Sequence, residues 1–281
     1  ITVKVAGMEV GSTAVTVSAR GAVPIAFHIA CHPSIRARVL TEMGYTATEV
    51  AWALLNEFGI GPEHVCQLLF NEGFDGPAAA QALAEVYGLD ASGAAQILKD
   101  VGYSSVQVGL ALKDFFLLTA LDAAQILRSV GFNATQICFA LRDVYYEAAD
   151  ESAQEVAAIL KAIGFNARMI GRALWDVYHE YESAEEAAPE VAEILKAIGY
   201  SVMEISIVLR DVFGLDMQPA AQILKDIGSA PKKVGEALKN VFEATASHVA
   251  QTFKSIGYGA KVSAEVLRDT FVLTGYHIAG L

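Results

Sequence analysis

The sequence predicts an all-α fold, an α-solenoid (superhelix) of about eight two-helix repeats that follows a short N-terminal β-hairpin or cap. Two observations predict it. A glycine recurs with successive spacings of 29, 29, 29, 33, 35, 29 and 29 residues, and a fixed period in this range is typical of solenoids. Apolar residues follow most of these glycines at positions +6, +9, +10, +13 and +14, which form one stripe of an α-helix. The glycines are Gly44, Gly73, Gly102, Gly131, Gly164, Gly199, Gly228 and Gly257.

Residues 1–32 do not carry the repeat and form the first predicted domain, a β-rich cap or the stub of a preceding domain. Two runs of alternating apolar and polar residues predict a hairpin with its turn at Gly11 and Ser12, and a further extended stretch is expected over 23–29. A cap is slightly favoured, because a solenoid needs an atypical end to cover its terminal core. The alternating apolar residues are Ile1, Val3, Val5, Val15 and Val17.

The second predicted domain, 33–281, is the α-solenoid repeat domain. In each repeat a first helix ends at the glycine, which can adopt the left-handed conformation of the C′ position. The aromatic residue that follows is expected to pack on the leucine four residues before the glycine, as Phe132 would on Leu127. A Lys or Arg three residues before the glycine is expected to complement the dipole of its own helix. Polar residues after the aromatic are expected to cap the second helix; they are Thr46, Asp75, Ser104, Asn133, Asn166 and Ser201.

The two longer spacings insert residues between 145 and 156 and between 178 and 191, on the same kind of connection. The window 145–193 holds eleven acidic residues and three basic ones. Insertions in repeat proteins gather on one face that is often the binding face, so this edge is a predicted site for a basic partner or, as the weaker choice, Ca²⁺. An equally weighted interpretation is that the acids only begin longer helices, where they favour the dipole. The candidate residues are Glu147, Asp150, Glu151, Glu180, Tyr181, Glu182, Glu185 and Glu186.

Composition excludes several classes of function. The net charge of −12 argues against binding a phosphate backbone, which needs clustered Lys and Arg. The longest nearly apolar run, 22–31, is too short for a membrane span. Three cysteines make no disulfide framework. Because the chain begins at Ile1 with neither an initiator Met nor a signal-peptide pattern, it is expected to be a fragment or a processed form of a longer protein.

Candidate chemistry is sparse. No nucleophile, nucleotide or metalloprotease motif is present, so no catalytic residue and no cofactor are predicted. His28, Cys31 and His32, with His64 and Cys66 one repeat later, have metal-ligand residue types, but CxxC pairs are absent and Cys66 is expected in a core, so no metal site is predicted. A recurrent aspartate of the second helix predicts a solvated face with weak inter-repeat ion pairs; a carboxylate ladder for a repetitive partner is the alternative. These aspartates are Asp114, Asp143, Asp176, Asp211 and Asp269.

The consensus Gly-Tyr/Phe-Ser/Asn-x-x-x-Val/Ile-x-x-Ala-Leu-Lys/Arg-Asp-Val-Phe/Tyr resembles α-solenoids, the class that holds tetratricopeptide and HEAT repeats, without the 34-residue period of the former. Over residues 33–271 it is similar to helical repeats of large bacterial secreted or surface proteins. The resemblance implies a non-catalytic scaffold, spacer or adhesin-like binding domain, extracellular or at the cell surface, with a protein or glycan partner. Two alternatives stay open: a helical accessory domain of an enzyme or toxin, and a carrier of lipid or another apolar ligand. The sequence does not decide the oligomeric state.

Overall fold

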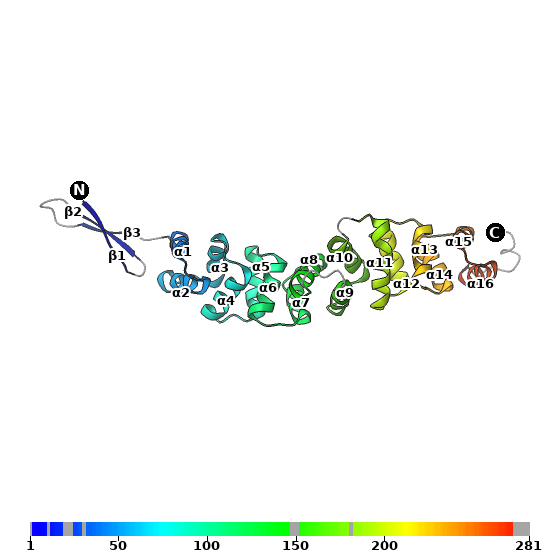
Figure 1. Ribbon diagram of the computed structural model, residues 1–281, viewed down its shortest axis with the longest axis horizontal. Coiled ribbons are helices and arrows are strands. Elements are labelled where there is room, and N and C mark those ends of the chain that lie inside the picture. The colour runs from blue at the N-terminus through cyan, green and yellow to red at the C-terminus, as the bar shows by residue number, and fades with distance from the viewer. Residues whose placement is uncertain are drawn as a thin grey trace. The chain divides into compact units, whose positions relative to one another are not determined.

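The computed structural model describes residues 2–9, 12–18 and 25–29 by their backbone, and residues 32–146, 152–179 and 182–271 in full (Figure 1). In these fully described ranges every regular element is helical, which confirms the all-α class and the helical repeat architecture. Contacts divide the chain into two units, Ile1–Gly131 and Phe132–Leu281.

The first unit begins with three strands, β1 (Thr2–Glu9), β2 (Ser12–Ser18) and β3 (Ile25–Ile29). They form an antiparallel sheet in the order β1-β2-β3, with Val3 opposite Val17 and Val15 opposite Phe27. Gly11 of the predicted turn lies outside the described residues. The role of this sheet as a cap of the array stays a prediction.

The helices of the first unit alternate between first and second helices of successive repeats. They are α1 (Pro33–Glu42), α2 (Ala47–Phe58), α3 (Pro62–Asn71), α4 (Gly76–Tyr87), α5 (Ala91–Val101), α6 (Ser105–Leu110) with its π-helical continuation η1 (Ala111–Phe115), and α7 (Ala120–Ser129). Second helices pack on second helices, as α4 does on α2 and η1, and first helices on first helices, as α5 does on α3 and α7. The unit therefore has two layers of helices.

The second unit repeats this plan. Its helices are α8 (Ala134–Ala140) with its π-helical continuation η2 (Leu141–Tyr145), α9 (Ala153–Ala162), α10 (Ala167–Tyr178), α11 (Ala184–Ala197), α12 (Val202–Asp211), α13 (Met217–Asp226), α14 (Pro231–Val241), α15 (Ala246–Ser255) and α16 (Ala260–Phe271). Helices α8, α10, α12, α14 and α16 form the layer of second helices, and α9, α11, α13 and α15 the layer of first helices. The leucine ten residues after each glycine lies in the core between the layers of its unit, at most 3% exposed. These leucines are Leu54, Leu83, Leu112, Leu141, Leu174, Leu209, Leu238 and Leu267.

The predicted hinges are confirmed. All eight glycines have φ between 74° and 113°, the left-handed region that favours glycine. At seven of these hinges the N–H of the following residue donates to a carbonyl five residues earlier, as Tyr103 N does to Leu98 O at 3.0 Å and Phe165 N to Leu160 O at 3.0 Å. This is the 6→1 bond of a Schellman motif. The six predicted N-caps each accept an N–H from the third residue of the second helix.

The basic residue three positions before the glycine acts on a helix that the sequence did not indicate. Lys161 Nζ donates to Ile198 O at 2.6 Å, in the next repeat, and Lys196 and Lys225 make the same bond to Ile227 and Ile256. Each accepting carbonyl directly precedes the next repeat's hinge glycine. Each of these lysines lies in the last turn of its own helix, as expected, and its ammonium group also reaches the C-terminal end of the following first helix.

Second helices are linked in the same direction. Lys239 Nζ donates to Thr270 O at 2.7 Å, and Arg142 and Arg210 donate to Val177 O and Val241 O of the next repeat. A charged donor at the end of a helix satisfies a carbonyl that has no partner within its own helix and favours the dipole. Both layers are thus joined from repeat to repeat by cation-to-carbonyl bonds.

Candidate functional site

The acidic edge predicted from the sequence is described in part. Glu147, Asp150, Glu151, Glu180 and Tyr181 lie outside the described residues. Glu182, Glu185 and Glu186 are described, at the start of α11, and all three are exposed. The structure gives each of them a separate setting.

Glu186 is part of a capping box. Its carboxylate accepts the N–H of Ser183 at 3.0 Å and the Ser183 hydroxyl at 2.9 Å, while Ser183 Oγ accepts the N–H of Glu186. The hydrogen bond from the Ser183 backbone holds the pKa of Glu186 below its usual value. Helix α11 has 14 residues, whereas the other described first helices have 10 or 11. Glu186, with Glu185 beside it in the first turn, therefore fits the interpretation that acids begin a longer helix.

Glu182 contacts a histidine that is isolated in the sequence. His179 is 5% exposed and ends α10; its Nδ1 lies 3.0 Å from Glu182 Oε2 and its Nε2 lies 4.0 Å from Glu190 Oε2. Within the described ranges Nε2 has no hydrogen-bond partner. Glu182 is thus within hydrogen-bond distance of a buried imidazole where α10 gives way to α11, and Glu190 lies nearby. The contact between His179 and Glu182 links the end of α10 to the segment that leads into α11.

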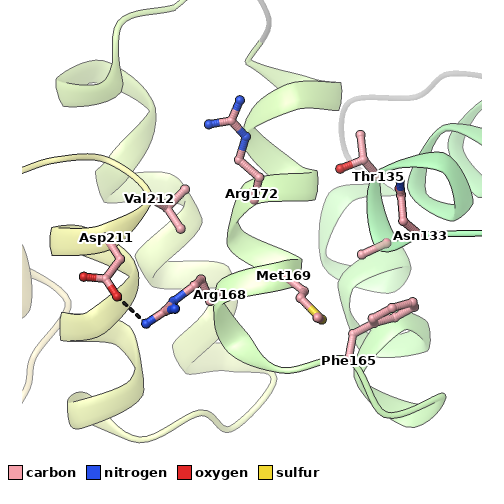
Figure 2. A pocket seen from close by; sticks show the side chains of 9 residues that line it. Asn133, Thr135, Phe165, Arg168, Met169, Arg172, Asp211 and Val212 are labelled. Atoms are coloured by element: carbon pink, nitrogen blue, oxygen red, sulfur yellow. Dashed lines mark hydrogen bonds and ion pairs between the residues drawn. The ribbon is translucent and has the colours of Figure 1, made fainter.

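A groove in the layer of second helices was not predicted from the sequence. It has a volume of about 380 Å³ and lies among α8, α10 and α12 of the second unit (Figure 2). Four apolar residues and five polar ones line it. The apolar ones are Ala134, Phe165, Met169 and Val212; the polar ones are Asn133, Thr135, Arg168, Arg172 and Asp211. Met169 is 50% exposed, so a large apolar side chain is available to a partner, and we call this site the Met169 groove.

Two arginines one helical turn apart border the Met169 groove. Arg168 forms an ion pair with Asp211 of α12, drawn as the dashed line in Figure 2. Arg172 Nε lies 2.9 Å from Asp176 Oδ1, and its guanidinium lies 5.1 Å from the Trp175 ring. The arginine side chains are 58% and 57% exposed, whereas their carboxylate partners are 22% and 30% exposed. The exposed charged groups of these two ion pairs are therefore mainly guanidinium.

Two arginines, Arg210 and Arg168, stabilise the ionised form of Asp211. A hydrogen bond from Arg210, and then the charges of Arg210 and Arg168, hold the pKa of Asp211 below its usual value. Because Arg168 belongs to the preceding repeat, the pair is one of the inter-repeat contacts expected for the recurrent aspartates. Lys232 and Asp269 form another, with Nζ 3.7 Å from Oδ2.

A second groove occupies the same repeat positions in the first unit. It is lined by the start of α2 and by α4, and its volume is about 540 Å³. In both grooves one side is formed by the residues two to four positions after a hinge glycine. The other side is formed by the residues one, five and eight positions after the next hinge glycine. We call this one the Ala78 groove; its residues are Thr46, Ala47, Thr48, Glu49, Phe74, Ala78, Gln81 and Glu85.

One sequence signal points to the Met169 groove. Five residues after the glycine the other repeats carry Glu, Gln or Lys in five of seven cases, and Ala or Val in the other two. Met169 is the largest apolar residue at this position, which starts a second helix and is exposed. The sequence signal of this groove is thus a departure from the repeat pattern at an exposed position.

The described residues hold little reactive chemistry. Cys66 and Cys138 are buried in the core, and burial raises the pKa of each thiol to about 12. Among the described residues no three His, Cys, Asp or Glu side chains gather as metal ligands would. None of the described helices combines the length and apolar character that crossing a membrane requires. Comparison with protein-family models and with curated proteins finds no match to this chain.

Proposed function

We propose that this chain is a non-catalytic repeat scaffold that binds a protein partner through its layer of second helices, with the Met169 groove as the main contact. The exposed Met169 carries the proposal. Methionine is enriched at protein interfaces, and its flexible thioether adapts to varied apolar partners. Ordered polar groups, Asn133, Thr135 and Arg172, surround it as a rim.

The openness of the groove favours a macromolecule over a small apolar ligand. Sites for small ligands bury most of the ligand surface. The residues that line the Met169 groove come from one layer of helices, so a lipid lying there would keep one side in water. A bound protein segment would itself shield the open side of the groove from water. This supports a partner-binding scaffold over the lipid-carrier alternative.

The wider architecture belongs to the same proposal. The glycine period continues from Gly131 to Gly164 across the boundary between the two units, which supports one continuous α-solenoid. By resemblance, such an array is a spacer or adhesin-like segment of a larger protein at the cell surface or outside the cell. Small-angle scattering tests the shape: an elongated particle is expected, and a compact one contradicts it.

The binding proposal is tested by selecting displayed random peptides on the wild-type protein. The selected peptides are then measured on Met169→Glu and on the matched control Met43→Glu, which alters a methionine of similar exposure (56%) on the first unit. We expect at least about tenfold weaker binding to the Met169 variant, the loss typical of a buried anchor, and unchanged binding to the control. Equal helicity by circular dichroism excludes unfolding. Peptides that bind both variants alike contradict the proposal.

The acidic edge is a second proposed contact, for a basic partner. Glu185 is exposed, and the structure gives it no cap or ion pair among the described residues. Replacing Glu180, Glu182, Glu185 and Glu186 with Gln tests it: loss of binding to a basic partner at unchanged helicity supports a site, and unchanged binding leaves only a charged helix start.

A further inference from the structure

We infer that the Met169 groove selects a protein segment in which an apolar anchor is flanked by one or two carboxylates. This inference rests on the proposed function and adds the chemistry of the partner. It follows from how the two arginines are held beside the apolar floor of the groove.

The apolar anchor follows from the floor. Met169, Phe165, Ala134 and Val212 offer carbon and sulfur surface with no polar group of their own to satisfy. Burying an aliphatic or aromatic side chain there stabilises a complex by roughly 25 cal/mol per Å² of apolar surface removed from water. A polar side chain in the same place loses its hydrogen bonds to water without replacement. One apolar side chain of the partner is therefore the best occupant.

The carboxylate follows from the orientation of the guanidinium groups. A guanidinium has five N–H donors, and an Arg–carboxylate pair can use two of them in parallel. Arg172 is fixed by Asp176 on one side and by the Trp175 ring, and Arg168 is fixed by Asp211. Because the internal carboxylates are the more buried members of these pairs, further donors face solvent. Fixed donors lose little conformational entropy when an outside carboxylate binds.

The Ala78 groove is the internal counterexample. Gln81 takes the place of Arg172, and its Nε2 donates to Glu85 at 2.8 Å. Glu49 and Glu85 are the charged residues that line this groove, so it repels a carboxylate. The two grooves share a frame and differ in the sign of their charge.

A polyanion fits the Met169 groove less well than a short acidic segment. Only Arg168 and Arg172 line it as cations, whereas binding to a phosphate backbone depends on several Lys and Arg contacts. The chain as a whole carries a net charge of −12, which repels a long polyanion but is screened beyond about 10 Å at 0.1 M salt. One or two carboxylates beside an apolar anchor interact with Arg168 and Arg172 and lie too close to them to be governed by the net charge of the whole chain.

The probe is a displayed peptide library with a fixed central leucine and random flanking positions, selected on the full chain. On the wild type we expect Asp and Glu to be enriched beside the leucine. Arg172→Gln should weaken the enriched peptides about tenfold, as expected from losing one charge-assisted contact. Arg172→Glu should replace the acidic preference with a basic one. Lys232→Glu, a charge change on α14 away from the groove, is the control and should leave the selection unchanged.

The outcomes separate the two proposals. Peptides that need Met169 but show no acidic preference, or ignore Arg172→Glu, overturn this inference and leave the proposed function in place. If no peptide depends on Met169, the proposed function fails, and this inference with it. Self-association of the wild type that Met169→Glu abolishes in sedimentation makes a second copy the occupant, which also overturns the inference. Salt-sensitive peptide binding lost in both Met169→Glu and Arg172→Glu supports it.

Discussion

The Met169 groove and the Ala78 groove are built at the same repeat positions, but the charged side chains that line them differ in net sign. Both have a phenylalanine directly after the hinge glycine, Phe165 or Phe74, and both face the capped start of a neighbouring second helix. They differ five and eight residues after the glycine, where Met169 and Arg172 stand against Ala78 and Gln81. The residues that build the frame are fixed by the fold, whereas the side chains that line the grooves at these two positions vary from repeat to repeat.

The largest expected effect tests whether the frame is equally stable in both units. Leu83→Ala and Leu174→Ala remove the same core leucine, fully buried in each unit, and each should lower the free energy of unfolding by roughly 2–5 kcal/mol. Urea melts followed by hydrogen exchange measure the loss and locate it. We expect each loss to be confined to the unit that carries the change. If either variant weakens both units equally, they unfold as one.

The second-largest effect compares the stability cost of adding a Cβ at two helical glycines, Gly76 and Gly171, whose φ is not left-handed. A Cβ on Gly76 would lie 2.2 Å from the backbone oxygen of Gln107, whereas a Cβ on Gly171 would lie 2.6 Å from Val208 Cγ1. A side chain can rotate away but a packed backbone cannot, so Gly76→Ala should cost about 1–3 kcal/mol. Gly171→Ala should cost less, because alanine also favours the helix interior. Thermal melts compare them; equal losses contradict the assignment of the closer contact.

A smaller effect transfers recognition between the grooves. Ala78→Met with Gln81→Arg, made in a Met169→Glu background, reproduces an anchor and an arginine four residues before an acidic residue, as in Arg172 and Asp176. Relative to Met169→Glu alone, we expect this variant to bind acidic, leucine-bearing peptides about tenfold more tightly, as measured by fluorescence polarisation. Ala78→Met alone is the matched control and should recover less. No recovery in the double variant means that the shared frame is insufficient.

The smallest effect compares one capping-box carboxylate in each unit. Hydrogen bonds from the backbones of Thr46 and Ser183 hold the pKa values of Glu49 and Glu186 below the usual 4.5. Each lowered pKa therefore adds stability above pH 4.5, which is lost as the pH falls through the folded-state pKa. Glu49→Gln and Glu186→Gln should each flatten this acid dependence in their own unit, followed by urea melts between about pH 3 and 7. An unchanged slope in both variants contradicts the capping assignment.

The hinges and caps could be predicted because their causes are local. A left-handed φ at Gly102 and a side-chain cap at Asn133 depend on a few neighbouring residues, and the sequence shows both. Position +15 shows the limit of such reasoning. Glycine ends the second helix there at Gly59, as expected, but Leu117 and Glu243 adopt the same left-handed conformation without glycine, each with φ of 55°. That conformation costs an L-residue roughly 1–2 kcal/mol. At both places the N–H of the next residue closes the helix end, from Leu118 to Leu112 O at 2.9 Å and from Ala244 to Leu238 O at 3.1 Å.

The candidate site was harder to predict because it depends on distant repeats. The Met169 groove joins residues from 133 to 212, and no local pattern reports which side chains meet across that span. The acidic edge was visible in composition, but composition does not separate a binding carboxylate from a cap, and Glu186 is a cap. His179 meets Glu182 within the connection that follows α10, and it meets Glu190 through the packing of α11 beside α10.

The bonds from Lys161 to Ile198 and from Lys225 to Ile256 bear on how such a chain can lengthen. In the repeats that form this bond, donor and acceptor occupy the same places, so duplicating such a repeat inserts one of each. The donor is 37 residues from its acceptor across the longer connection and 31 across a regular one, so extra residues in the connection do not break the link. Duplication of such a repeat can therefore lengthen the array and keep these bonds, whereas a cut inside a repeat separates a donor from its acceptor.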